Sequence, residues 1–119
     1  MSRAEELRIQ DYLGHILEAI ERINRYVGTI GEDDFLEDEK TQDAVIRNFE
    51  IIGEASRNIE RYQPDFAREH SEISWGIAYE MRNVLAHGYF MVDMEIVWKT
   101  IKNDLPKMAE SVLRLVNSQ

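Results

Sequence analysis

Residues 9–30, IQDYLGHILEAIERINRYVGTI, carry the longest helical pattern of the chain, because their apolar side chains recur at steps of three and four residues. This spacing places them along one stripe of a long amphipathic helix. Ser2 and Glu5 have the spacing of a capping box at the start of this helix, and Gly28 marks its end. The stripe consists of Ile9, Tyr12, Leu13, Ile16, Leu17, Ile20, Ile23, Val27 and Ile30.

Three further segments of the chain follow the same helical period. The pattern predicts a second helix over about residues 41–61, with Gly53 allowing close approach of another backbone, and a short turn over residues 65–70 after Pro64. A third helix is expected to begin near residues 71–74 and to end around His87, because the next residue, Gly88, is a good helix terminator. Asp93 is a candidate N-cap for the last helix, which Pro106 should kink or split, with Asp104 capping its second half.

The fold class predicted from these segments is all-α. No strand-like alternation and no internal repeat interrupts the helical pattern of the 119 residues. We expect a single domain over residues 1–119, built as a four-helix up-and-down bundle with short extra helices. The acidic stretch of residues 32–39 would be a solvated loop or a short helix, anchored by Phe35 and Leu36. Trp75 and Trp98 are expected in the core or at a dimer interface.

Composition and charge exclude several classes of protein. The apolar runs are too short to cross a membrane, and the charged N-terminus lacks a signal-peptide core, so we expect a cytoplasmic location. Without cysteine there can be no disulfide, thiolate metal site or cysteine nucleophile. Glu54, Glu60 and His70 show no recognisable ligand spacing, so neither a metal nor a cofactor is predicted. The net charge of −9 argues against broad binding to nucleic acids such as DNA, although a local basic cleft is compatible with it.

Residues 80–90, EMRNVLAHGYF, hold the side chains best suited to chemistry. Arg82 supplies a planar cation that can bind a phosphate through two hydrogen bonds, and His87 can give or take a proton near neutral pH. Asn83 could orient either group. The two side chains are about 140° apart on an ideal helix, so they converge only if the helix ends before His87 or if a second copy contributes its own pair. We expect both, with two pairs lining a cleft on the twofold axis of a homodimer.

The same residues resemble a known family. RNVLAHGY (residues 82–89) is similar to the Arg-x4-His-x-Tyr motif of HEPN-domain proteins, in their HepT-like toxin branch. RNFEIIGEA (residues 47–55), VDMEIVW (residues 92–98) and DLP (residues 104–106) resemble other blocks of that branch, in the same order. The resemblance therefore covers most of the chain.

The resemblance implies a homodimeric, metal-independent endoribonuclease that is the toxin of a type VII-like toxin–antitoxin module. Arg82 and His87 would be catalytic, and a nucleotidyltransferase antitoxin would transfer AMP from ATP to Tyr89. Glu54 and Arg47 could support the Arg82–His87 cluster, although ordinary salt bridges between helices explain these two residues at least as well. His15 and His70 are expected at the surface.

Two other interpretations remain open. The acidic charge and the lack of a basic stripe are compatible with a non-catalytic partner of a nucleotidyltransferase that binds nucleotide or only that enzyme. The other interpretation is that the chain is a dimeric adaptor in which Arg82 and His87 only pack or form ion pairs. RNA cleavage separates the ribonuclease from both alternatives.

Overall fold

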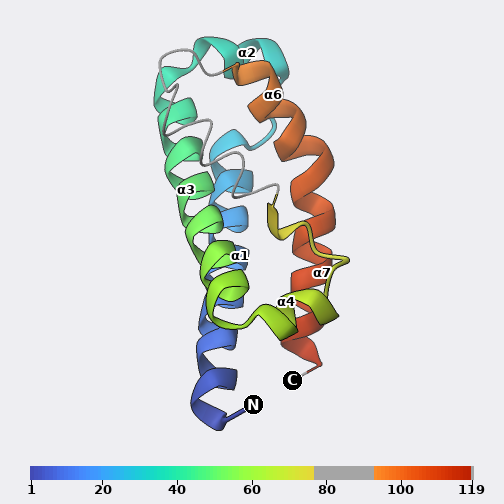
Figure 1. The fold of residues 1–119 in the computed structure, drawn as a ribbon. Coiled ribbons are helices and arrows are strands. Elements are labelled where there is room, and N and C mark those ends of the chain that lie inside the picture. Colours follow the sequence, from blue (N-terminus) through green and yellow to red (C-terminus); the bar gives the residue numbers. More distant parts are fainter. Residues whose placement is uncertain (77–92, 119) are drawn as a thin grey trace.

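The computed structural model describes residues 1–76 and 93–118, and all regular structure there is helical (Figure 1). The predicted all-α fold is therefore confirmed. The elements are α1 (Arg3–Val27), α2 (Glu32–Glu37), α3 (Glu39–Tyr62), α4 (Pro64–Glu69), α6 (Met94–Lys99), the π-helical turn η2 (Thr100–Asp104) and α7 (Leu105–Asn117).

Helix α1 has the two ends that its sequence predicts. The hydroxyl of Ser2 accepts a hydrogen bond from the backbone N–H of Glu5 at 3.2 Å, which caps the first turn. At the other end, Gly28 has φ +51° and its N–H donates to the carbonyl of Asn24 at 2.9 Å. Glycine suits this position because other residues rarely adopt a positive φ.

The acidic stretch after α1 is a helix rather than a solvated loop. Its residues 32–37 form α2, whose first turn holds Glu32, Asp33 and Asp34, where carboxylates interact favourably with the backbone N–H groups. The ring of Phe35 is fully buried, so this short helix is attached to the core by the apolar anchor that the sequence indicated.

Helix α3 begins at Glu39, two residues before the predicted start, because Asp38 caps it. The carboxylate of Asp38 accepts hydrogen bonds from the backbone N–H of Thr41 at 3.0 Å and from the Thr41 hydroxyl at 2.6 Å. These hydrogen bonds stabilise the ionised form, so the pKa of Asp38 lies below its ordinary value. Two polar side chains of α3, Asn48 and Ser56, are buried.

The turn after α3 forms helix α4, as predicted, with Pro64 in its first turn. Proline suits this position because the first N–H groups of a helix have no intrahelical partner. His70 follows α4 and is half-buried rather than a plain surface residue. Its ring packs at a tilt of 50° against Phe66, with centroids 4.6 Å apart, and its Nδ1 lies 3.4 Å from a carboxylate oxygen of Glu72.

The C-terminal helix is interrupted before Pro106, as the sequence predicts, but not by a cap at Asp104. Asp104 makes no side-chain capping hydrogen bond, so that part of the prediction is wrong. The chain instead widens into η2, where the N–H of Leu105 donates to the carbonyl of Thr100, five residues back. Such a π-helical turn accommodates Pro106, which lacks the N–H that a regular α-helix would need.

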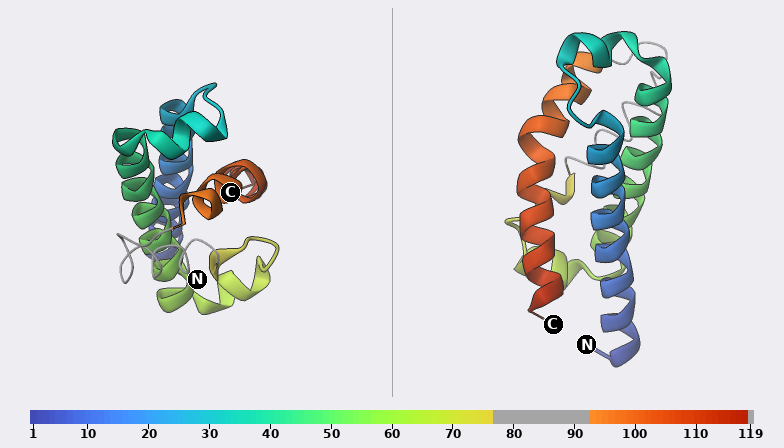
Figure 2. Two further views of the ribbon diagram at one scale, coloured as in Figure 1. Left: turned by 90° about the horizontal axis from the view of Figure 1, so that it is seen from above. Right: turned by 180° about the vertical axis from the view of Figure 1, so that it is seen from behind.

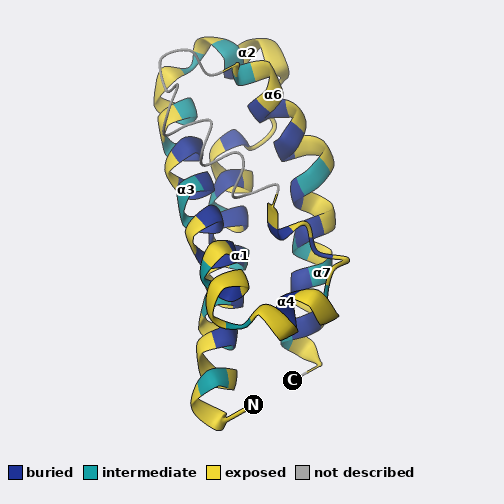
Figure 3. Ribbon diagram, in the orientation of Figure 1, coloured by how far each residue is buried: buried dark blue, intermediate teal, exposed yellow. Residues whose placement is uncertain are grey.

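The described helices pack around one apolar core. Helix α1 contacts α3 and α7, while α2 bridges α3 and α6 at the end of the molecule opposite the two termini (Figures 1 and 2). The buried positions face inward along each long helix (Figure 3). Trp75 and Trp98 are both buried, which confirms their predicted role as anchors in the core.

Candidate functional site

The residues of the predicted catalytic motif lie outside the part of the chain that the structure describes. Arg82, Asn83, His87 and Tyr89 all fall within residues 77–92, so their proposed roles stay predictions. The predicted third helix also extends into this segment; of its described residues, Trp75 and Gly76 are helical.

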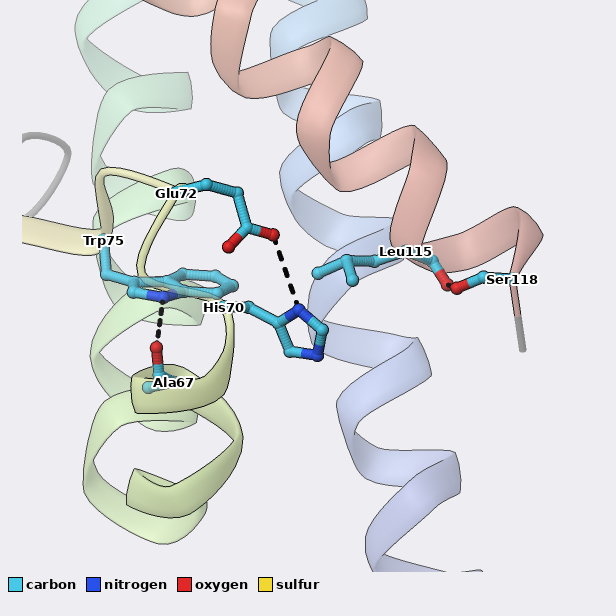
Figure 4. Close-up of polar contacts among 6 residues, drawn as sticks. All are labelled: Ala67, His70, Glu72, Trp75, Leu115 and Ser118. Atoms are coloured by element: carbon cyan, nitrogen blue, oxygen red, sulfur yellow. Dashed lines mark hydrogen bonds and ion pairs between the residues drawn. The ribbon is translucent and has the colours of Figure 1, made fainter.

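The chain that leads into the motif is fixed to α4. The N–H of the Trp75 indole donates to the carbonyl of Ala67 at 3.3 Å, and the indole is 5 % exposed (Figure 4). The backbone N–H of Ile73 donates to the carbonyl of His70 at 3.1 Å, which closes the turn between α4 and Trp75. A buried tryptophan thus sets the position from which the motif segment starts.

The chain that leaves the motif is also fixed. Asp93 caps α6, as predicted, and its carboxylate accepts a hydrogen bond from the N–H of Glu95 at 2.9 Å. One turn later, Val97 and Trp98 enter the core. The motif is therefore bounded on both sides by residues that are held in the packed body of the protein.

The two predicted supporting residues on α3 line one groove. Arg47 and Glu54 are two turns apart, and the groove of about 490 Å³ that they share runs between α3 and α1. Helix α1 contributes Tyr12 and His15, and α3 also supplies Glu50, Ile51, Ala55 and Asn58. Their spacing already places Arg47 and Glu54 on one face of a helix, and the structure adds that this face borders α1.

This groove contains both positively and negatively charged side chains. A guanidinium nitrogen of Arg47 lies 3.7 Å from a carboxylate oxygen of Glu50, and both side chains are exposed to solvent. His15 is exposed, as predicted, but its position in the groove was missed. One signal for it was available, since His15 follows Tyr12, a member of the apolar stripe, by three residues and so lies beside it on the same helix.

The described part of the chain shows neither a metal-binding cluster nor a membrane-crossing helix. Across residues 1–76 and 93–118, no group of three or more His, Asp or Glu side chains could hold a metal ion. Over the same residues, no helix combines the length and the apolar character that a membrane crossing requires.

Comparison with known proteins identifies the family. Residues 16–115 match the family described as "Ribonuclease HepT-like". The chain is 52 % identical over 99 residues to the "Probable ribonuclease HepT" of Thermococcus cleftensis, an alignment that covers 83 % of this chain and 87 % of that protein.

A second relative is a larger protein. It is the "Gamma-glutamylcyclotransferase and putative RNase MJ0434" of Methanocaldococcus jannaschii, to which the chain is 42 % identical over 108 residues, covering 91 % of this chain and 47 % of that protein. No solved structure gives a significant match. The family match spans most of the sequence and agrees with the all-α fold, so this chain belongs to the HepT-like ribonuclease family.

Proposed function

We propose that this protein is a metal-independent endoribonuclease toxin of a type VII-like toxin–antitoxin module. The observation that carries the proposal is the complete Arg82–His87–Tyr89 pattern in a chain of the HepT-like ribonuclease family. RNA is the substrate, the cytoplasm is the site of action, and the two catalytic side chains are Arg82 and His87.

The proposed reaction follows from the chemistry of these side chains. The 2′-hydroxyl of a ribose attacks the adjacent phosphorus, the bond to the 5′-oxygen of the next nucleotide breaks, and a 2′,3′-cyclic phosphate remains. His87 takes the proton of the hydroxyl or gives one to the leaving oxygen, and Arg82 stabilises the charge on the phosphate oxygens. DNA lacks the attacking hydroxyl and would not be cut.

We further propose that the active form is a homodimer. Two copies would place two Arg82–His87 pairs in one cleft on the twofold axis, which supplies both an acid and a base. Asn83, Glu54 and Arg47 would support the cluster. A joint role for Arg47 and Glu54 is supported by their position in one groove.

Control of the toxin would act at Tyr89. A nucleotidyltransferase antitoxin would transfer AMP from ATP to the phenol oxygen of Tyr89, with pyrophosphate as the leaving group. The added phosphate brings negative charge and bulk beside the motif, and both would hinder the approach of RNA.

The nature of the cleavage products tests the proposed reaction. The purified protein is incubated with a single-stranded RNA in the presence of EDTA, and the ends of the products are identified by mass spectrometry. We expect cleavage with 2′,3′-cyclic phosphate or the 2′- and 3′-phosphates that form from it. Products with 5′-phosphate and 3′-hydroxyl ends, or cleavage that stops on chelation, would refute the proposed chemistry.

One observation favours a second function. The net charge of −9 is unusual for a protein that binds RNA, and it suits a non-catalytic partner of a nucleotidyltransferase that binds nucleotide. Calorimetric titration with ATP and with RNA separates the two functions. ATP binding without RNA turnover supports the partner role, whereas RNA cleavage supports the ribonuclease.

A further inference from the structure

The groove between α1 and α3 has the features of a binding surface for one nucleotide. Its base is apolar where Ile51 and Ala55 line it, and the Tyr12 ring borders it from α1. Both groove walls belong to long helices that contact each other along the bundle. Side chains held on such elements keep their relative positions better than side chains on loops.

Arg47 is the cation of this groove and can bind a phosphate. Its contact with Glu50 is a long one, at 3.7 Å, and the two side chains are 71 % and 44 % exposed. Exposed ion pairs of this kind contribute little stability, so breaking the contact with Glu50 costs little. The planar guanidinium offers several donors that match two phosphate oxygens.

The remaining polar groups of the groove suit a ribonucleotide. His15 and Asn58 carry ring nitrogens and an amide, which can bond to the ribose hydroxyls or to the edge of a base. Tyr12 presents an aromatic ring, the type of surface on which unpaired bases of single-stranded RNA stack. The volume of about 490 Å³ leaves room for a single nucleotide unit.

A second concave surface has a similar composition but is less suitable. It lies between the start of α1 and α4, and it includes Arg3 and His70. His70 is already engaged, because its ring packs at a tilt against Phe66. Its Nδ1 also faces the Glu72 carboxylate (Figure 4).

We propose that the α1–α3 groove holds one nucleotide of the RNA substrate, with a backbone phosphate on Arg47. The inference rests on the proposed ribonuclease function and adds a substrate contact to it. It gives Arg47 a direct role in binding instead of a role in orienting the motif. Because Glu50 and Glu54 lie in the same groove, only about one phosphate is held there.

A matched pair of arginine variants tests the inference. Arg114 on α7 is the control, because it is 73 % exposed and forms a similar ion pair with Glu110 at 3.4 Å. Arg47→Ala and Arg114→Ala are made in a His87→Ala background, and fluorescence anisotropy measures the binding of a labelled single-stranded RNA at several salt concentrations. We expect Arg47→Ala to weaken binding about tenfold and to lower the salt slope by about 0.7, the value for one phosphate on a single strand.

Catalysis by the otherwise wild-type protein gives an independent readout. Arg47→Ala should raise KM about tenfold with little change in kcat. The reason is that Arg47 would contact the RNA equally in the bound ground state and in the transition state. Arg47→Lys keeps the charge without the planar fork, so its KM should lie between those of the wild type and Arg47→Ala. Arg114→Ala should match the wild type.

Three results would overturn the inference. Equal binding, salt slope and KM for Arg47→Ala and Arg114→Ala would remove Arg47 from the RNA surface. A change from dimer to monomer in Arg47→Ala, measured by light scattering, would make the groove a contact between subunits. A loss confined to kcat would return Arg47 to a role in orienting the motif.

A wild-type protein that cuts no RNA would refute the proposed function instead, and the binding assay would still report on the groove.

Discussion

The indole of Trp98 in α6 packs against the phenyl ring of Phe35 in α2, with ring centroids 5.2 Å apart and an interplanar angle of 37°. The ammonium group of Lys102 lies 4.7 Å from the centre of the same indole, on the next turn. This contact joins the acidic helix α2 to the first helix after the motif segment. It therefore holds the start of the described chain after residue 92 against α2.

Truncation of Phe35 should destabilise the protein strongly. Its ring is fully buried, and Phe35→Ala removes the contact with Trp98 and leaves a cavity, so we expect a loss of about 3–5 kcal/mol in the free energy of unfolding. Urea denaturation measures the loss. Tyr62→Ala is the control, because Tyr62 is 58 % exposed and its truncation should change stability by less than about 1 kcal/mol. Similar values for the two variants would contradict the burial of α2.

Removal of the Ser56 hydroxyl should stabilise the protein. Ser56 is fully buried, and its oxygen has no hydrogen-bond partner among the described residues. A buried hydroxyl without a partner costs free energy, so Ser56→Ala should raise the free energy of unfolding by about 1 kcal/mol. Thermal denaturation would show the rise. A decrease of similar size would mean that the hydroxyl makes a contact that contributes to stability.

The cap of α3 should give the protein an acid-dependent stability. The Asp38 pKa is lowered in the folded state from its ordinary value of 3.8, because Thr41 donates two hydrogen bonds to the carboxylate. Its contribution is therefore fully present above the unfolded-state pKa and is lost as the pH falls through the folded-state pKa.

Asp38→Asn tests this contribution, because asparagine can still cap the helix but does not ionise. The wild type should have the higher melting temperature at about pH 7, and the difference should shrink as the pH falls towards about pH 3. A difference that stays constant over this range would contradict the role of the ionised carboxylate.

Tyr89 should accept AMP from the partner enzyme. When the protein is incubated with ATP and the nucleotidyltransferase of its module, its intact mass should increase by one or more AMP units, and its ribonuclease activity should fall. Tyr89→Phe should keep its mass and its activity under the same conditions. An unchanged wild-type mass beside an active enzyme would refute this modification.

The sequence predicted the long helices well, because their apolar period and their caps are local signals. Ser2, Gly28 and Asp93 end or begin helices where they were expected to do so. The errors have local physical causes. Asp38 starts α3 earlier than the apolar pattern does, and a π-helical turn before Pro106 replaces the expected cap at Asp104.

The candidate site could be predicted only in part. Residue type and family resemblance indicate Arg82, His87 and Tyr89, but the pairing of α1 with α3 is a tertiary contact that no local pattern contains. Arg47 and His15 are far apart in the sequence, and they line one groove only because these two helices pack side by side (Figure 2). The groove that combines Arg47 and His15 therefore depends on the tertiary packing of α1 and α3.

The rate of RNA cleavage by His87→Ala shows whether His87 acts as the general acid or base. Cleavage of one labelled RNA is measured for the wild type, Arg82→Ala, His87→Ala and the control His70→Ala, at equal dimer concentration and in the presence of EDTA. We expect a loss of about 10²–10⁴-fold for His87→Ala, the usual contribution of a general acid or base, and a large loss for Arg82→Ala. His70→Ala should cleave at a rate close to that of the wild type. Equal rates for His87→Ala and the wild type would contradict the account.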